Sequence, residues 1–153
     1  MKKTVAVIGS RGAIGNAVVD TLLADESVEA VFKFSRAEIT EHDDKVKHIF
    51  IDIEDEESIK QATESLPEDT KFDLIFVATG ILHDEKNVFP EKSIKDISFD
   101  KLIKVLTINT IGPTLVGKYF IPYLRKDSKS TFAFLSARVG SISDNKLGGW
   151  YSY

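Results

Sequence analysis

Three evenly spaced glycines near the start of the sequence constrain this chain more than any other feature. Residues 5–20 read VAVIGSRGAIGNAVVD, which is an apolar run, then Gly9, Gly12 and Gly15, then a run with helical periodicity. Glycines between a strand and a helix permit a tight turn and bring backbone N–H groups close to a ligand. The positive helix N-terminus favours an anion such as pyrophosphate there. We interpret the segment as a nucleotide-binding turn, although its G-x-x-G-x-x-G spacing also fits an ordinary strand-to-helix turn.

Short apolar runs recur behind this turn, with helical patterns between them. Five of these runs are typical of strands, at residues 4–8, 28–34, 46–51, 72–78 and 131–135. Several are apolar at consecutive positions, as strands covered on both faces must be. Strands that alternate with helices indicate a parallel sheet with crossover helices. We therefore predict one α/β domain over residues 1–153, a doubly wound, Rossmann-like parallel sheet with strand order 3-2-1-4-5.

The helical patterns and the irregular segments fall between these strands. The strongest helical periodicity runs over residues 99–124, with Ser98 as the N-cap and a bend at Gly112 and Pro113. The acidic run at 54–57 predicts the solvated first turn of another helix, where it complements the helix dipole. Residues 81–97 are long and irregular enough to form a loop beside a site.

Composition excludes several classes of function. The 153 residues carry a formal net charge of -4, so no basic field exists to hold nucleic acid or an anionic membrane. The absence of cysteine removes thiolate metal sites and cysteine nucleophiles, and suits a reducing cytoplasm, where we expect the protein. His42, His48 and His83 show no metal-ligand spacing, so we expect no metal. No segment is long and apolar enough to predict a membrane span.

Four segments together resemble the short-chain dehydrogenase/reductase family, in particular its carbonyl-reductase-like branch related to bacterial C-factor. They are GSRGAIG at the start, DLIFVATG ending at Gly80, TINTIGPTLVGKYFIPYL around Asn109, and FLSARVGSISDNKLGGWYSY ending at Tyr153. The last segment is the most specific one. The resemblance covers essentially the whole chain. It implies an NAD(P)(H) cofactor and hydride transfer to or from a small carbonyl or alcohol substrate.

The resemblance assigns cofactor roles to residues that match the family pattern. It implies that the phosphates lie against the glycine turn, the adenine against the end of the third strand, and the ribose and nicotinamide against the end of the fourth. The matching residues are Gly9, Arg11, Gly12, Ile14 and Gly15 for the phosphates, Asp52 and Ile53 for the adenine, and Ala78, Thr79 and Gly80 for the ribose and nicotinamide. Thr79 and Gly80 fit a helix-cap turn equally well.

The end of the second strand bears on cofactor choice. NAD-specific sites usually place an acid there, whereas NADP sites use basic residues that neutralise the 2'-phosphate. Here the strand ends in Ser35 and Arg36, and Arg11 lies in the glycine turn. We predict NADP(H) rather than NAD(H), with two solvated surface charges as the alternative.

The resemblance also implies a catalytic set. Tyr153 would give or take the hydroxyl proton, and Asn109 would position a water molecule, unless its amide only satisfies a local carbonyl. The family serine aligns with Ala137, which has no hydroxyl, and Ser136 and Ser141 lie on either side of it. We favour Ser141, because loops beyond strand ends build sites. A turn or a cap is the alternative for each serine. Tyr151 is the competing tyrosine, and an aromatic cluster of Trp150, Tyr151 and Tyr153 over the sheet edge is the alternative to a catalytic role.

The family pattern continues beyond Tyr153. Its lysine lies four residues after the tyrosine, and its later strands and helices complete the sheet and the substrate pocket. We therefore expect residues 1–153 alone to be an incomplete domain that binds NADP(H) weakly at best and shows no appreciable carbonyl reduction. The alternative function is a dinucleotide-binding sensor, a scaffold or an inactive remnant without turnover. A homo-oligomer is compatible with the sequence.

Overall fold

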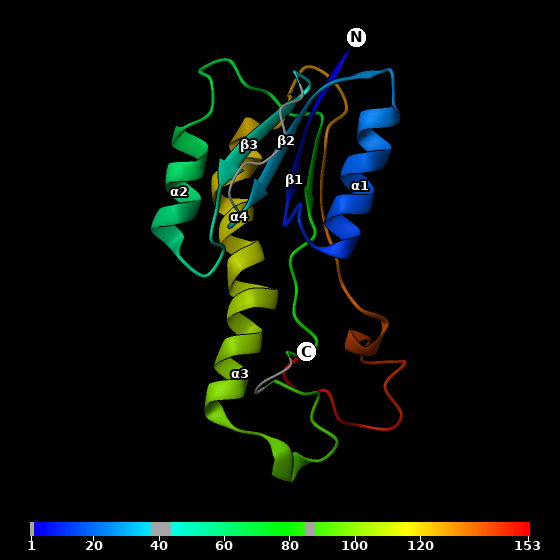
Figure 1. Cartoon of the computed structure of the whole chain (residues 1–153). Coiled ribbons are helices and arrows are strands. Elements are labelled where there is room, and N and C mark those ends of the chain that lie inside the picture. Colours follow the sequence, from blue (N-terminus) through cyan, green and yellow to red (C-terminus); the bar gives the residue numbers. More distant parts are fainter. Residues whose placement is uncertain (1, 38–43, 85–87) are drawn as a thin grey trace.

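A five-stranded parallel sheet forms the centre of the protein, in a computed structural model that describes residues 2–37, 44–84 and 88–153. Its order is β3-β2-β1-β4-β5, which confirms the predicted order (Figure 1). The predicted strands all form, with ends that shift by one or two residues. They are β1 (Lys3–Ile8), β2 (Val28–Ser35), β3 (Val46–Phe50), β4 (Leu74–Val77) and β5 (Thr131–Phe134). His42 and residues 85–87 of the predicted loop lie outside the described residues.

Helices cover both faces of the sheet, as the consecutive apolar residues of the strands require. Val5 and Val7 of β1 pack with Val19 of α1 (Ala13–Ala24) on one face. The alternate residues Ala6 and Ile8 belong to the larger core on the other face. That core contains residues of α2 (Glu56–Glu64) and α4 (Gly112–Phe120), and the rings of Phe34 and Phe120 meet edge to face at 5.1 Å. The predicted doubly wound arrangement is therefore confirmed.

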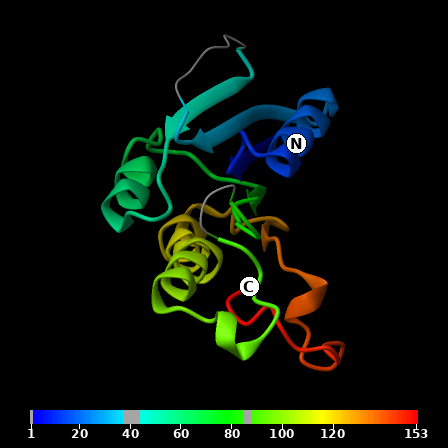
Figure 2. The same cartoon turned by 60° about the horizontal axis from the view of Figure 1, so that its bottom comes forward.

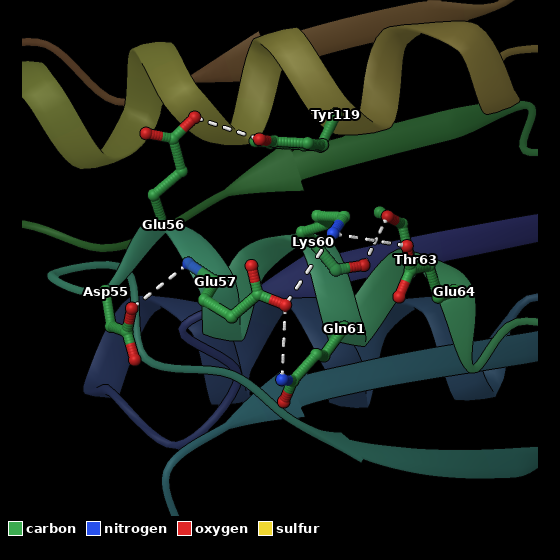
Figure 3. A network of polar contacts seen from close by, with 8 residues as sticks. All are labelled: Asp55, Glu56, Glu57, Lys60, Gln61, Thr63, Glu64 and Tyr119. Carbon is green, nitrogen blue, oxygen red and sulfur yellow. Dashed lines mark hydrogen bonds and ion pairs between the residues drawn. The ribbon is translucent and has the colours of Figure 1, made fainter.

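Helix α2 begins with a polar network rather than with a solvated turn alone. The Asp55 carboxylate caps it by accepting a hydrogen bond from the backbone N–H of Glu57 at 3.0 Å. The Glu56 carboxylate accepts a hydrogen bond from the Tyr119 hydroxyl at 2.9 Å (Figure 3). It also accepts one from Lys118 Nζ at 2.7 Å. The acidic run thus favours the helix N-terminus, as predicted, and also joins α2 to α4.

The predicted helix over residues 99–124 is interrupted by one wide turn. Helix α3 (Phe99–Leu106) begins after Ser98, whose hydroxyl accepts a hydrogen bond from the Lys101 N–H. A π-helical turn (Thr107–Ile111) then leads into α4, and the 3-10 turn Ile121–Tyr123 follows it. The irregular turn lies just before Gly112 and Pro113, where we predicted a bend. Proline has no N–H for the carbonyl four residues back, which here is that of Asn109.

The carboxyl ends of the strands share one edge of the sheet, and the irregular segments gather beyond it. The described residues of 81–97 form no strand and contain one short 3-10 turn, Ile94–Asp96. The segment after β5 contains another, Arg138–Gly140, and its last residues lie beside the segment that precedes α3, where they form hydrogen bonds with Glu91 (Figure 2). Two segments that are far apart in the sequence therefore meet beyond the same edge.

Candidate active site

The glycine turn after β1 has two crowded positions and one open position. Gly9 has φ +80°, and a Cβ there would lie 2.8 Å from the Thr79 side chain. A Cβ on Gly15 would collide with the carbonyl oxygen of Gly9, so this glycine lets α1 begin against the turn. A Cβ on Gly12 would meet only the Gly9 carbonyl oxygen, at 3.5 Å. The turn therefore needs Gly9 and Gly15 for its own packing, and Gly12 faces open space.

A cleft of 460 Å³ opens beside this turn, and we call it the glycine-turn cleft. It is lined by every predicted cofactor residue except Ile14 and Gly15. These residues are Gly9, Arg11, Gly12, Ser35, Arg36, Asp52, Ile53, Ala78, Thr79 and Gly80. The sequence did not indicate Ala37, Ile51, Glu54, Ile81 and Ile108, which also line it. Ile108 carries no local signal, because only the packing of the π-helical turn brings it to the sheet edge.

The charged rim of the glycine-turn cleft contains an acid as well as the predicted arginine. Arg36 Nη1 lies 3.6 Å from Oε1 of Glu54, and the Arg36 side chain is 67% exposed. The other oxygen of Glu54 accepts a hydrogen bond from Lys104 Nζ at 2.6 Å. Glu54, which we predicted to lie in a solvated turn, is thus shared between two cations. Arg36 has an acidic neighbour that an anionic ligand would have to displace or tolerate.

The other predicted residues of this rim are held by local hydrogen bonds. Ser35 is buried, and its hydroxyl accepts a hydrogen bond from the Ala37 N–H at 3.4 Å. The Asp52 carboxylate accepts one from the Glu54 N–H at 3.0 Å, which shapes the turn after β3. Both side chains are therefore fixed before any ligand binds.

A second cleft, of 420 Å³, adjoins the first, and we call it the tyrosine cleft. Both clefts are lined by Ala78, Thr79 and Gly80, so the end of β4 joins them. The tyrosine cleft brings together the predicted residues Asn109, Ser136 and Tyr153, with Ile14 and Ala137 also lining it. The Tyr153 ring meets the Trp150 ring edge to face at 5.8 Å, so the aromatic contact considered as an alternative is also present.

Ser141 does not line the tyrosine cleft. Its hydroxyl lies 3.2 Å from that of Ser143 and accepts a hydrogen bond from the Asp144 N–H at 3.3 Å. Tyr151 does not line the cleft either, and it is 49% exposed. Of the two serines and two tyrosines considered, the structure brings Ser136 and Tyr153 together.

Asn109 is fixed to the loop that follows β4. Its side-chain amide donates a hydrogen bond to the Ile81 carbonyl at 2.8 Å and accepts one from the Ile81 N–H at 2.7 Å. This is the local role that the sequence left open as the alternative. The pair of bonds also holds the loop between the two clefts, so Asn109 shapes the site whether or not it binds water.

Thr79 contributes a buried hydroxyl at the junction of the clefts. Its Oγ1 has no hydrogen-bond partner among the residues that the structure describes. A buried hydroxyl without a partner is costly, and such groups are usually satisfied by water or a ligand. This orphan hydroxyl and the open position at Gly12 both fit a ligand that extends through the two clefts.

Two other kinds of site find no support in the described part of the chain. No group of three or more histidine or acidic side chains within residues 2–37, 44–84 and 88–153 could hold a metal ion. No helix there is long and apolar enough to cross a membrane. The clefts at the sheet edge thus remain the candidate site.

Comparison with known proteins gives the class to which this fold and these clefts belong. Residues 3–152 match the family described as short chain dehydrogenase, and the chain belongs to that family, whose members are generally NAD(P)-dependent oxidoreductases. The family resemblance seen in the sequence is therefore confirmed.

Individual relatives are distant and longer. The 1-hydroxy-2-glutathionyl-2-methyl-3-butene dehydrogenase of Rhodococcus sp. (strain AD45) is 27% identical over 98% of this chain and 63% of that protein. C-signal of Myxococcus xanthus is 31% identical over 40% of this chain and 37% of that protein. The NADPH-bound carbonyl reductase from chicken fatty liver has a TM-score of 0.79 and 25% identity, over 95% of this chain and 61% of that one. This chain spans less than two thirds of each relative.

Proposed function

We propose that this chain forms the nucleotide-binding part of an NADP(H)-dependent oxidoreductase that acts on a small carbonyl or alcohol. The observation that carries the proposal is the junction of the two clefts at Ala78, Thr79 and Gly80. One cleft has a glycine turn and two arginines, as a dinucleotide phosphate requires, and the other has a tyrosine and a serine. Family membership and the NADPH bound to the chicken carbonyl reductase support the same assignment.

Each part of the cofactor has candidate partners in the chain. The N–H groups around Gly12 and the start of α1 would hold the pyrophosphate, and Arg11 and Arg36 would neutralise the 2'-phosphate. Asp52 and Ile53 would lie against the adenine, and the Thr79 hydroxyl would gain a hydrogen-bond partner. When bound, the nicotinamide supplies or accepts the hydride.

The proton would move in the tyrosine cleft. We assign Tyr153 as the group that gives or takes the proton of the substrate hydroxyl. We now favour Ser136 over Ser141 as the hydroxyl that orients the substrate oxygen, because Ser136 lines the cleft with Tyr153 and Ser141 does not. Asn109 would keep the loop between the clefts in place through Ile81.

The cofactor assignment is tested by titrating NADPH and NADH into the purified protein and into Arg36→Ala. We expect NADPH to bind more tightly than NADH, and Arg36→Ala to weaken NADPH at least tenfold, about 1.4 kcal/mol, while NADH changes less than about twofold. Glu54→Gln should bind NADPH more tightly, because it removes the acid 3.6 Å from Arg36. Lys126→Ala, which removes the same charge from an exposed position, is the control.

The outcomes separate this proposal from its alternatives. Equal or tighter binding of NADH by the unaltered protein would refute the NADP(H) assignment. A protein as long as its relatives should oxidise NADPH with some member of a panel of aldehydes and ketones. If it binds NADPH but oxidises none with any of them, the result would favour a dinucleotide-binding sensor. Activity that survives Tyr153→Phe would refute the tyrosine assignment.

A further inference from the structure

Glu91 is a buried acid that contacts the C-terminal segment of the chain. Its side chain belongs to the irregular segment before α3 and is 2% exposed. The Trp150 N–H donates a hydrogen bond to the Glu91 carbonyl at 2.8 Å, and the Ser152 N–H donates one to Glu91 Oε2 at 3.4 Å. A Cβ on Gly149 would lie 2.7 Å from the Glu91 carbonyl oxygen. The main chain of Glu91 therefore bonds Trp150 and lies close against Gly149, and its side chain bonds Ser152.

The charge of Glu91 is stabilised by the segment that it holds. Burial acts to raise the pKa of this carboxyl group. Donation by the Ser152 hydroxyl and by the nearby backbone N–H groups of Glu91, Ser152 and Tyr151 outweighs burial and keeps the pKa below its usual value. A buried carboxylate is tolerated only with such donors. Glu91 Oε2 finds them in the C-terminal segment, whereas Oε1 has no hydrogen-bond partner among the described residues.

The held segment has an unusual backbone. Gly148, Gly149 and Trp150 have φ values of 69°, 78° and 58°, which are three consecutive residues in the left-handed region. Among the described residues, Trp150 is the one non-glycine residue with positive φ, and a bulky side chain adopts this conformation at a cost in free energy. Such strain persists only where the surroundings enforce it, and it is common at functional sites. Here the contacts with Glu91 enforce it.

The strained turn leads directly to Tyr153. The Trp150 ring lies edge to face against the Tyr153 ring at 5.8 Å, and Tyr153 lines the tyrosine cleft. Because Glu91 fixes residues 149–152, it also fixes the residue that follows them. We propose that Glu91 is a positioning residue, which places Tyr153 in the tyrosine cleft through the turn at Trp150. The proposal rests on the proposed function for the role of Tyr153.

Trp150 is the one tryptophan in the sequence, so its fluorescence reports on this turn alone. In Glu91→Ala we expect acrylamide quenching to rise about twofold and the emission to shift to the red. Glu91→Gln, which keeps an acceptor oxygen, should change less. Glu56→Gln is the matched control, because Glu56 bonds Lys118 and Tyr119 and lines neither cleft. NADPH affinity should change less than about twofold in all three, because Glu91 does not line the glycine-turn cleft.

The catalytic readout is the oxidation of NADPH with an aldehyde. Glu91→Ala should lower kcat at least tenfold with an unchanged KM for NADPH. Glu91→Gln should lower kcat less, because it keeps an acceptor oxygen. If Glu91→Ala fails to fold, Gly149→Ala makes the same test, since its Cβ would push the segment away from an intact Glu91. Unchanged Trp150 quenching and kcat in folded variants would overturn the proposal. Failure of the unaltered protein to bind NADPH would instead refute the proposed function, and the quenching result would still stand.

Discussion

Gly15 and Gly12 lie in the same turn, but an added side chain should have a different effect at each. At Gly15 it should lower the stability of the fold, and at Gly12 it should lower the affinity for NADPH. In Gly15→Ala, the new Cβ would collide with the Gly9 carbonyl oxygen, and it would lie 2.9 Å from the Gly9 carbonyl carbon and 3.1 Å from Ser10 Cα. All three are backbone atoms, which cannot rotate away. Overpacking of this kind costs about 1–3 kcal/mol, and alanine recovers up to about 1 kcal/mol of helix propensity. We expect a net loss of about 1–2 kcal/mol, which lowers Tm by about 2–8 °C.

Gly12 has the backbone and the space for a side chain. Its φ of -67° and ψ of 159° are open to any residue, and the nearest atom to an added Cβ would be the Gly9 carbonyl oxygen at 3.5 Å. Gly12→Val should therefore change the free energy of unfolding by less than about 1 kcal/mol. The valine would occupy the glycine-turn cleft where a phosphate would approach the N–H groups of α1. We expect NADPH affinity to fall at least tenfold.

Thermal melting and NADPH titration of both variants separate the two effects. Gly15→Ala should show the lower Tm, and Gly12→Val should keep its Tm and lose NADPH. A Gly12→Val protein that binds NADPH normally would mean that this turn is only a strand-to-helix connection. A Gly15→Ala protein of unchanged Tm would mean that α1 can shift away from Gly9 and that the two are not closely packed.

Two further predictions concern the core and the polar network between α2 and α4. Phe120→Ala should cost about 3–5 kcal/mol and lower Tm by about 6–20 °C, because the ring is fully buried against Phe34. Glu56 has its pKa held below the usual 4.5 by hydrogen bonds from Lys118 and Tyr119, so its contribution is complete above pH 4.5 and is lost as the pH falls through the lower folded value. Lys118 has its pKa raised above 10.5 by Glu56, so its contribution is lost only as the pH rises through that higher value. The Tm difference between the unaltered protein and Glu56→Gln should thus be constant from about pH 4.5 to about pH 10.5 and should shrink at lower and at higher pH. A difference that stays constant below pH 3 would contradict the lowered pKa of Glu56.

Local patterns in the sequence determined the sheet and the glycine turn. Strand and helix periodicities depend on neighbouring residues, so the five strands and the cap at Ser98 could be predicted from spacing. The parallel order followed from the alternation of strands and helices. Most residues of the glycine-turn cleft follow directly from strand ends, and the carboxyl ends of parallel strands meet at one edge. That is why their grouping was predictable without coordinates.

Only the tertiary structure decided which side chains from distant segments meet. The pairing of Glu54 with both Arg36 and Lys104 depends on how α3 packs beside the turn after β3. The choice of Ser136 over Ser141 depends on the path of the chain after β5, where no periodicity constrains it. Glu91 and Ser152 are 61 positions apart, and neither segment is a helix or a strand. Contacts of this kind are set by burial and hydrogen bonding between irregular segments, for which a sequence has no repeating pattern to indicate a partner.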